Sequence, residues 1–116
     1  MNSISTTISS SKVEGTNVYN PKGDKLGSIS DLVIDKQGGH VRYAALEFGG
    51  FLGIGTDRYP LPWSLLKYDT VKDGYVVNLE KSQLENAPHY AKDDEPLYSE
   101  DYGRDVYDYY GAPWGR

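Results

Sequence analysis

The stretch KLGSISDLVIDKQGGHVRYAALEF, residues 25–48, decides the fold. Apolar residues occupy both sides of residues 25–35, which predicts a buried strand, and Gly27 is where we expect a β-bulge. Residues 36–39 contain two glycines, which favours a hairpin connection. Residues 40–48 then run back as the partner strand. The stretch therefore predicts an antiparallel hairpin at the centre of the fold.

Turn signals recur on both sides of this hairpin. Before it, a strand candidate at residues 17–19 ends in Asn-Pro-Lys-Gly (20–23), where proline presets φ for a turn. After it, Asp73-Gly74 separates strand candidates at residues 68–71 and 75–79. Five or six short strands with turns at this spacing predict an all-β fold, a small antiparallel β-barrel of about six strands.

Composition limits the class of protein. The chain has 116 residues, the length of one small domain, and its 38% hydrophobic content excludes a wholly disordered chain. A net charge of −5 argues against nucleic-acid binding. The absence of cysteine excludes disulfides and thiolate metal sites. No apolar run approaches the roughly 20 residues that span a bilayer, so we expect no direct membrane insertion.

We divide the chain into three parts. Residues 1–12 are rich in serine and threonine and lack the basic and apolar regions of a secretory signal, so we expect a flexible segment of a cytoplasmic protein. Residues 13–88 carry the strand pattern and one short helix candidate at 82–85. Residues 89–116 hold seven acidic and three basic residues and form the third part, an extended acidic tail.

The tail is unusual because it is rich in aromatic rings as well as in acids. It contains six of the eleven tyrosines together with Trp114, whereas ordinary disordered tails contain few aromatic residues. A loose solubilising tail is one interpretation. We prefer a segment that docks on its own or a neighbouring chain. The anchors and possible partner-binding residues are then Tyr107, Tyr109, Tyr110 and Trp114.

The alternation of apolar and polar residues also predicts which side chains lie inside the domain. The set is taken from the strand candidates and from the Pro-Trp segment that follows them. It comprises Leu26, Ile29, Leu32, Val33, Ile34, Val41, Leu46, Phe48, Trp63, Leu66, Val77 and Leu79.

Motifs for nucleotide or metal binding are weak. The glycine-rich segment at residues 49–55 has neither the order nor the following helix of a phosphate-binding loop, so we interpret it as a structural hairpin loop. His40 and His89 are far apart in sequence and lie in no metal-binding spacing. We expect no metal and no cofactor.

Carboxylates offer the remaining route to catalysis. Asp31 and Asp35 lie near Glu47 if the hairpin pairs as expected, but an acid–base pair also needs a pocket that separates the two pKa values. On a strand face such carboxylates more often pair with a cation, such as Arg42. No serine lies in a nucleophile motif either. We therefore expect no enzyme activity.

Taken together, these segments resemble the PRC-barrel family, named for the cytoplasmic domain of the photosynthetic reaction centre H subunit. The matching motifs lie at residues 26–35, 39–43, 49–55 and 62–66, within a resemblance over residues 13–88. The tail is similar to the Tyr-Gly-rich ends of stand-alone bacterial members. The resemblance implies a small six-stranded barrel that serves as an adaptor, with no catalytic residues.

Two classes of function follow. The first is a non-enzymatic protein-interaction module that forms a homodimer or binds a protein partner of unknown identity. The alternative is a barrel that binds a small ligand or ion beside the glycine-rich segment at residues 49–55, or a regulatory module of a membrane-associated electron-transfer complex.

Overall fold

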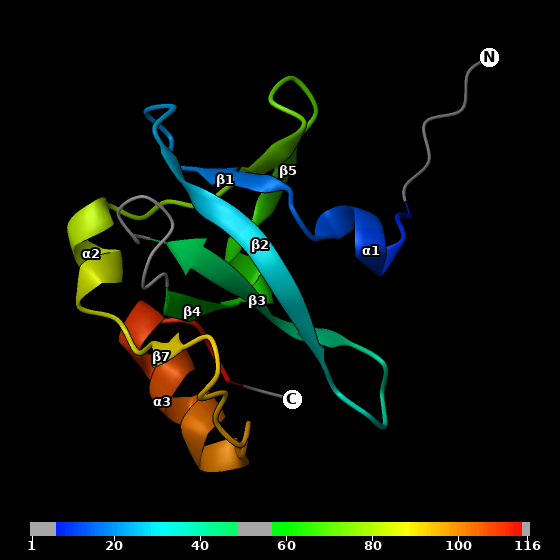
Figure 1. Cartoon of the computed structure of the whole chain (residues 1–116), viewed down its shortest axis with the longest axis vertical. Helices are drawn as coiled ribbons and strands as arrows, with labels where there is room; N and C mark the ends of the chain where they lie inside the picture. Colours follow the sequence, from blue (N-terminus) through cyan, green and yellow to red (C-terminus); the bar gives the residue numbers. More distant parts are fainter. Residues whose placement is uncertain (1–6, 49–56, 115–116) are drawn as a thin grey trace.

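The computed structural model describes residues 7–48 and 57–114. The described chain is mostly β and builds one sheet in the order β5-β6-β1-β2-β3-β4-β7 (Figure 1). Its strands are β1 (Asn17–Tyr19), β2 (Lys25–Ile34), β3 (Val41–Phe48), β4 (Asp57–Pro62), β5 (Lys67–Asp69), β6 (Gly74–Val76) and β7 (Tyr90–Ala91). The helices are α1 (Ser10–Val13), α2 (Lys81–Glu85) and α3 (Glu100–Tyr110), with a 3-10 turn η2 at Trp63–Leu65.

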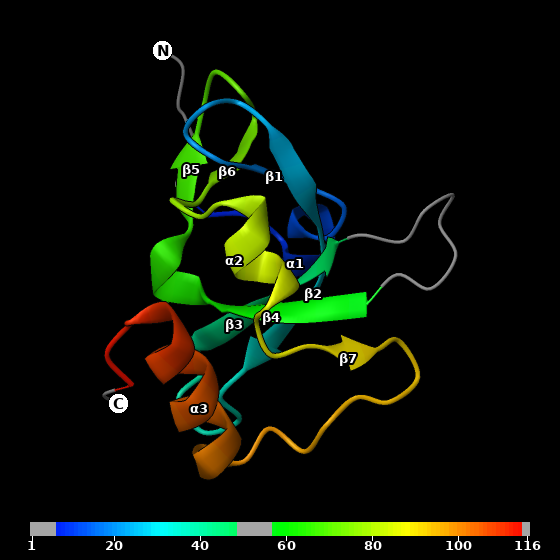
Figure 2. The same ribbon diagram turned by 90° about the vertical axis from the view of Figure 1, so that its left-hand side faces the viewer.

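The sheet differs from the expected barrel of about six strands. It has seven strands, because the tail contributes β7 beside β4. Neighbouring strands are antiparallel, apart from the parallel pair β1 and β6. Within residues 7–48 and 57–114, no pairing joins β5 to β7, so the sheet has two ends. The two ends lie on opposite sides of the molecule (Figure 2).

The central hairpin is confirmed. β2 pairs with β3 through positions such as Ile29 opposite Leu46. The bulge expected at Gly27 is also present, because Val18 pairs with Gly27 and Tyr19 with Lys25, which leaves one residue of β2 unmatched. A Cβ on Gly27 would lie 2.2 Å from the carbonyl oxygen of Glu47. Glycine is required there because the two backbones approach so closely.

Most of the predicted core is confirmed, and one residue is wrong. Ile34 is 48% exposed because it ends β2 beside the open hairpin turn, beyond the part of the sheet that other elements cover. The remaining predictions divide into two groups. The buried residues are Leu26, Ile29, Leu46, Leu66, Val77 and Leu79, and the partly buried ones are Leu32, Val33, Val41, Phe48 and Trp63.

The two terminal parts contain more helix than the sequence suggested. The tail is not extended, because α3 occupies eleven of its residues. The Ser99 hydroxyl accepts a hydrogen bond from the Tyr102 amide at 3.1 Å, and Gly111 ends the helix with φ of 70°. The N-terminal segment, expected to be flexible up to residue 12, contains the start of α1, whose Val13 is buried. In both cases burial of apolar residues stabilises a helix that propensity alone leaves marginal.

Candidate functional site

The outer side of β4 pairs with β7 at Asp57 and Arg58, and further along the strand it is suited to cover by a helix. Pro60 and Pro62 are fully buried and pair with Ala45 and Tyr43 of β3. Proline fits this ladder only where its missing N–H points away from β3, so the outer side of β4 lacks donors at both positions. The helix α3 contacts β4 there and covers it (Figure 2). The sequence of β4 therefore matches a helical cover.

A second core cluster forms where the tail meets β3. Its buried members are Tyr43 of β3 and Val106, Tyr107 and Ala112 of the tail. The Tyr43 ring lies 5.7 Å from the ring of Tyr107, edge to face, and 5.1 Å from that of Tyr98. Pairs of rings at these separations are favourable beyond the area that they bury. The tail thus extends the domain core instead of hanging free.

Gly103 sits in the middle of α3 at the closest contact of this interface. A Cβ at Gly103 would lie 2.1 Å from Cη2 of Trp114 and 2.6 Å from the hydroxyl oxygen of Tyr43. No real Cβ tolerates such distances. The glycine weakens the helix intrinsically, and it is what lets the Trp114 and Tyr43 side chains reach the helix.

Arg42 of β3 joins the sheet to the end of the tail. Its guanidinium carbon lies 4.0 Å from the ring centre of Trp114, a cation–π contact, and its Nη2 donates to the Trp114 carbonyl oxygen at 3.4 Å. Its own carbonyl oxygen accepts a hydrogen bond from the Tyr107 hydroxyl at 2.5 Å. Both the backbone and the side chain of Arg42 therefore hold the tail. Sequence reasoning missed this role and expected Arg42 to pair with carboxylates.

The four tail residues predicted from the sequence all contact their own chain. Tyr107 is buried, and Tyr110 and Trp114 are partly buried. Tyr109 is 42% exposed, and its hydroxyl donates to the Gln83 carbonyl oxygen of α2 at 2.6 Å. The sequence analysis expected the tail to dock on its own or a neighbouring chain, and in this structure it docks on its own chain. Binding of a partner by these residues stays a prediction.

Burial keeps the phenols of this interface neutral. Desolvation raises the pKa of Tyr43 and of Tyr102 to about 12 each. It also raises the pKa of Tyr98, whose hydroxyl lies 2.6 Å from that of Tyr90, and the pKa of Tyr110. The hydroxyls of Tyr102 and Tyr110 are buried without a hydrogen-bond partner among the described residues. Ionisation of any of these rings would oppose docking of the tail.

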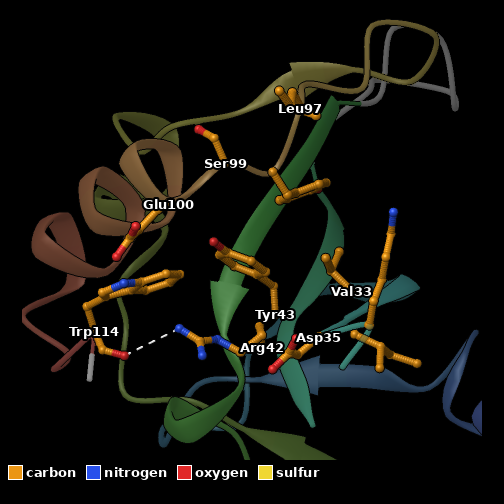
Figure 3. A pocket seen from close by; sticks show the side chains of 11 residues that line it. Val33, Asp35, Arg42, Tyr43, Leu97, Ser99, Glu100 and Trp114 are labelled. Carbon is orange, nitrogen blue, oxygen red and sulfur yellow. Dashed lines mark hydrogen bonds between the residues drawn. The ribbon is translucent and has the colours of Figure 1, made fainter. Parts of the chain in front are cut away.

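A pocket opens between the tail and the end of the β2–β3 hairpin (Figure 3). Its volume is about 540 Å³, and its apolar walls are Val33, Ile34 and the rings of Tyr43, Tyr98 and Trp114. A smaller pocket of about 300 Å³ adjoins it on the other side of the Arg42–Trp114 contact. Arg42, Asp35 and Trp114 line both pockets.

The three carboxylates considered for catalysis each have an interaction partner within the chain. Asp31 and Glu47 both pair with Arg58 of β4, at 3.3 and 3.5 Å, so Arg58 is the cation that the sequence analysis placed at Arg42. The Asp35 carboxylate accepts from the Gln37 amide at 3.2 Å in the hairpin turn. The pairing with Arg58 thus offsets the negative charges of Asp31 and Glu47 on the sheet surface.

The two histidines lie in different parts of the structure. His89 lies 3.4 Å from the Asp57 carboxylate and stacks on Tyr59, while His40 lines the smaller pocket. Across the described ranges there is no cluster of three or more metal-ligating side chains. The glycine-rich segment at residues 49–55 lies outside the described residues.

Strand β5 forms the opposite end of the sheet. Strand β5 pairs with β6 and has no second strand neighbour in the part of the chain that the structure describes. Tyr68 of β5 is 50% exposed, and its hydroxyl donates to the Asp73 carboxylate. Val71, in the turn that follows, is 92% exposed. A groove of about 490 Å³ separates this hairpin from the N-terminal segment around Ile8 and Lys12.

The fold and its surfaces define a small β-sheet module with a helical C-terminal extension. Residues 5–84 match the PRC-barrel domain, so the chain belongs to the PRC-barrel domain family. This confirms the resemblance noted from the sequence, and the tail lies beyond the matched residues. A search of the curated proteins found no matching relative. None of the described helices has the length and apolar character needed to cross a membrane.

Proposed function

We propose that this protein is a non-catalytic interaction module that associates with a second copy of itself through strand β5. The observation that carries the proposal is the sequence Lys67-Tyr68-Asp69 on a strand that pairs with β6 on one side and with no other strand among the described residues. If two copies pair antiparallel about a two-fold axis at Tyr68, each Lys67 faces Asp69 of the other copy. A two-fold interface must be complementary to itself, and this strand is.

The contrast between the two sheet edges supports the proposal. At the β4–β7 end, the short strand β7 pairs with β4 at Asp57 and Arg58, Pro60 and Pro62 remove backbone donors, and α3 contacts the strand. The β5 edge carries no proline and leaves Tyr68 half exposed. A lysine on an edge strand ordinarily discourages pairing, but Asp69 provides an opposite charge at the right position. Strand addition at such an edge is a common mode of protein association.

The neighbouring hairpin is suited to the same contact. Lys72 and Asp73 follow in the β5–β6 turn, so the hairpin carries balanced charges. The Asp69 carboxylate accepts from the Val71 and Lys72 amides at 2.9 and 3.1 Å, which fixes it at the end of the strand. Exposed Val71 adds apolar area beside the paired strands. A dimer formed here presents its two tails at the far ends, free to contact other partners.

The test is the molecular mass by light scattering over a range of protein concentration. We expect the wild-type mass to rise toward twice the 12.9 kDa of one chain. Lys67→Glu should abolish the rise, because it places like charges opposite each other, whereas Lys25→Glu makes the same charge change on β2 and should not. A wild-type mass that stays at one chain at every concentration overturns the proposal.

A matched pair of tyrosine variants separates the β5 edge from the tail. Tyr68 and Tyr109 are similarly exposed, and each hydroxyl is bonded within its own chain. Tyr68→Glu should yield a monomer and Tyr109→Glu should leave the dimer intact. The reverse result would assign self-association to the tail, whose residues Tyr107, Tyr109, Tyr110 and Trp114 the sequence analysis gave as possible partner-binding residues.

A further inference from the structure

We propose that the pocket between the tail and the β2–β3 hairpin binds a small organic carboxylate with an aromatic or aliphatic body. The pocket has the features of a ligand site. Its volume of about 540 Å³ lies within the range of small-molecule pockets, roughly 300–1,000 Å³. Six of its eleven lining residues are aromatic or aliphatic, and the other five are polar or charged, so the pocket can hold both the body and the charged group of a ligand.

The charged side chains that line the pocket favour an anionic ligand. The pocket is lined by two cations, Lys36 and Arg42, and by two carboxylates, Asp35 and Glu100. Glu100 is paired with Arg104 at 2.9 Å, whereas Asp35 accepts a hydrogen bond from the Gln37 amide and keeps its negative charge. Among the described residues neither Arg42 nor Lys36 has a carboxylate within 4.0 Å. With the Glu100–Arg104 pair set aside, two cations face one carboxylate, so the pocket has an excess of positive charge.

Arg42 is preorganised for this role. Its guanidinium is held against the Trp114 ring at 4.0 Å, and Figure 3 shows it at the base of the pocket near Trp114 and Tyr43. A planar guanidinium fixed in one orientation loses little entropy when it binds a carboxylate. One hydrogen bond of 3.4 Å to the Trp114 carbonyl leaves most of its donors for a ligand.

The body of the ligand would lie against the Tyr43 and Trp114 rings and Val33. Trp114 and Tyr98 come from the tail, while Tyr43 and Val33 come from the sheet. The pocket therefore exists only while the tail is docked. Binding should stabilise the docked tail by mass action, which links ligand binding to the state of α3.

The probe is 2-naphthoate, compared with 2-naphthamide, which has the same rings without the charge. We expect naphthoate to shift the NMR signals of the Arg42 guanidinium, the Ile34 amide and the Trp114 indole in a saturable manner. Naphthamide should bind at least about tenfold more weakly, because it lacks the charge-assisted hydrogen bonds. Equal binding of the two compounds, or shifts elsewhere in the molecule, overturns the proposal.

The variants Ile34→Glu and Ile34→Lys provide a matched charge test. Ile34 lines the pocket and is half exposed, so either substitution leaves the core intact. Both remove the same apolar side chain, but glutamate should weaken naphthoate binding and lysine should preserve or strengthen it. Arg42→Gln should weaken binding about tenfold or more. Equal affinities for the two Ile34 variants contradict the proposal even if Arg42→Gln fails to fold.

The inference does not depend on self-association. The pocket is lined by residues of β2, of β3, of the hairpin turn between them and of the tail, and none of its lining residues belongs to β5. The titration is therefore repeated with Tyr68→Glu, where we expect the same affinity for naphthoate. If the protein binds naphthoate but stays a monomer, the proposal of self-association is wrong. If it dimerises but does not bind naphthoate, the proposal of a carboxylate site is wrong.

Discussion

Gly103 and Trp114 are packed so closely that Gly103 has no room for a side chain, since a Cβ there would lie 2.1 Å from the indole Cη2. The helix that carries Gly103 therefore packs directly against Trp114, which lies four residues beyond the end of that helix. Tyr43 of the sheet completes the contact, because its hydroxyl would lie 2.6 Å from the same Cβ. Docking of the tail depends on this absent side chain.

Gly103→Ala should therefore destabilise the protein, although alanine favours helix by about 1 kcal/mol over glycine. Overpacking at this contact should cost about 1–3 kcal/mol, so the net effect is a loss. The measurement is urea unfolding, with Asp105→Ala as the control because Asp105 is exposed on the same helix. The control should be neutral or slightly stabilising. A Gly103→Ala protein at least as stable as the control would contradict the contact.

Leu46→Ala should lower the free energy of unfolding by about 2–5 kcal/mol, because Leu46 is fully buried opposite Ile29 in the central hairpin. The matched control is Leu97→Ala. Leu97 is 86% exposed, so the same substitution there should change the stability by less than about 0.5 kcal/mol. Similar losses for the two variants would show that the register of the β2–β3 pair is wrong.

Deletion of residues 97–116 should lower the melting temperature and increase binding of a hydrophobic dye, because it uncovers Tyr43 and the buried prolines of β4. The molecular mass of the dimer should fall only by the mass of the deleted residues, since strand β5 is untouched. Differential scanning calorimetry and light scattering measure the two effects. An unchanged melting temperature would mean that the tail contributes nothing to the domain.

Alkaline pH should destabilise the docked tail. Burial raises the pKa of Tyr43 and of Tyr102 to about 12, above the ordinary value of 10.0 for tyrosine. Below pH 10 the phenols are neutral in both the folded and the unfolded chain, so the stability is complete there. Between about pH 10 and about pH 12 the unfolded chain loses protons first, and the stability falls as pH rises. Urea unfolding across this range measures the loss.

Tyr102→Phe isolates one contribution to that loss. The variant removes a titrating group and a buried hydroxyl that has no partner among the described residues. It should be as stable as the wild type or more so at neutral pH, and should lose less stability in alkali. A clear destabilisation at neutral pH would mean that the hydroxyl has a partner.

Local patterns were sufficient for the central part of the molecule. The hairpin at residues 25–48, the bulge at Gly27 and the burial of Leu46 all follow from alternation of apolar residues and from turn chemistry, which act over a few positions. The aromatic content of the tail also indicated docking. The predicted burial of Ile34 was wrong because the alternation of apolar residues does not show where along a strand the covering elements end.

Tertiary structure alone decided the shape of the tail and of the pocket. The sequence around Gly103 and the acidic residues of the tail does not favour a helix, yet α3 forms because Val106 and Tyr107 are buried against Tyr43. The pairing of Arg42 with Trp114 joins residues 72 positions apart in the chain. Contacts of this kind leave no periodic trace in either segment, because they depend on how the whole sheet positions two distant surfaces.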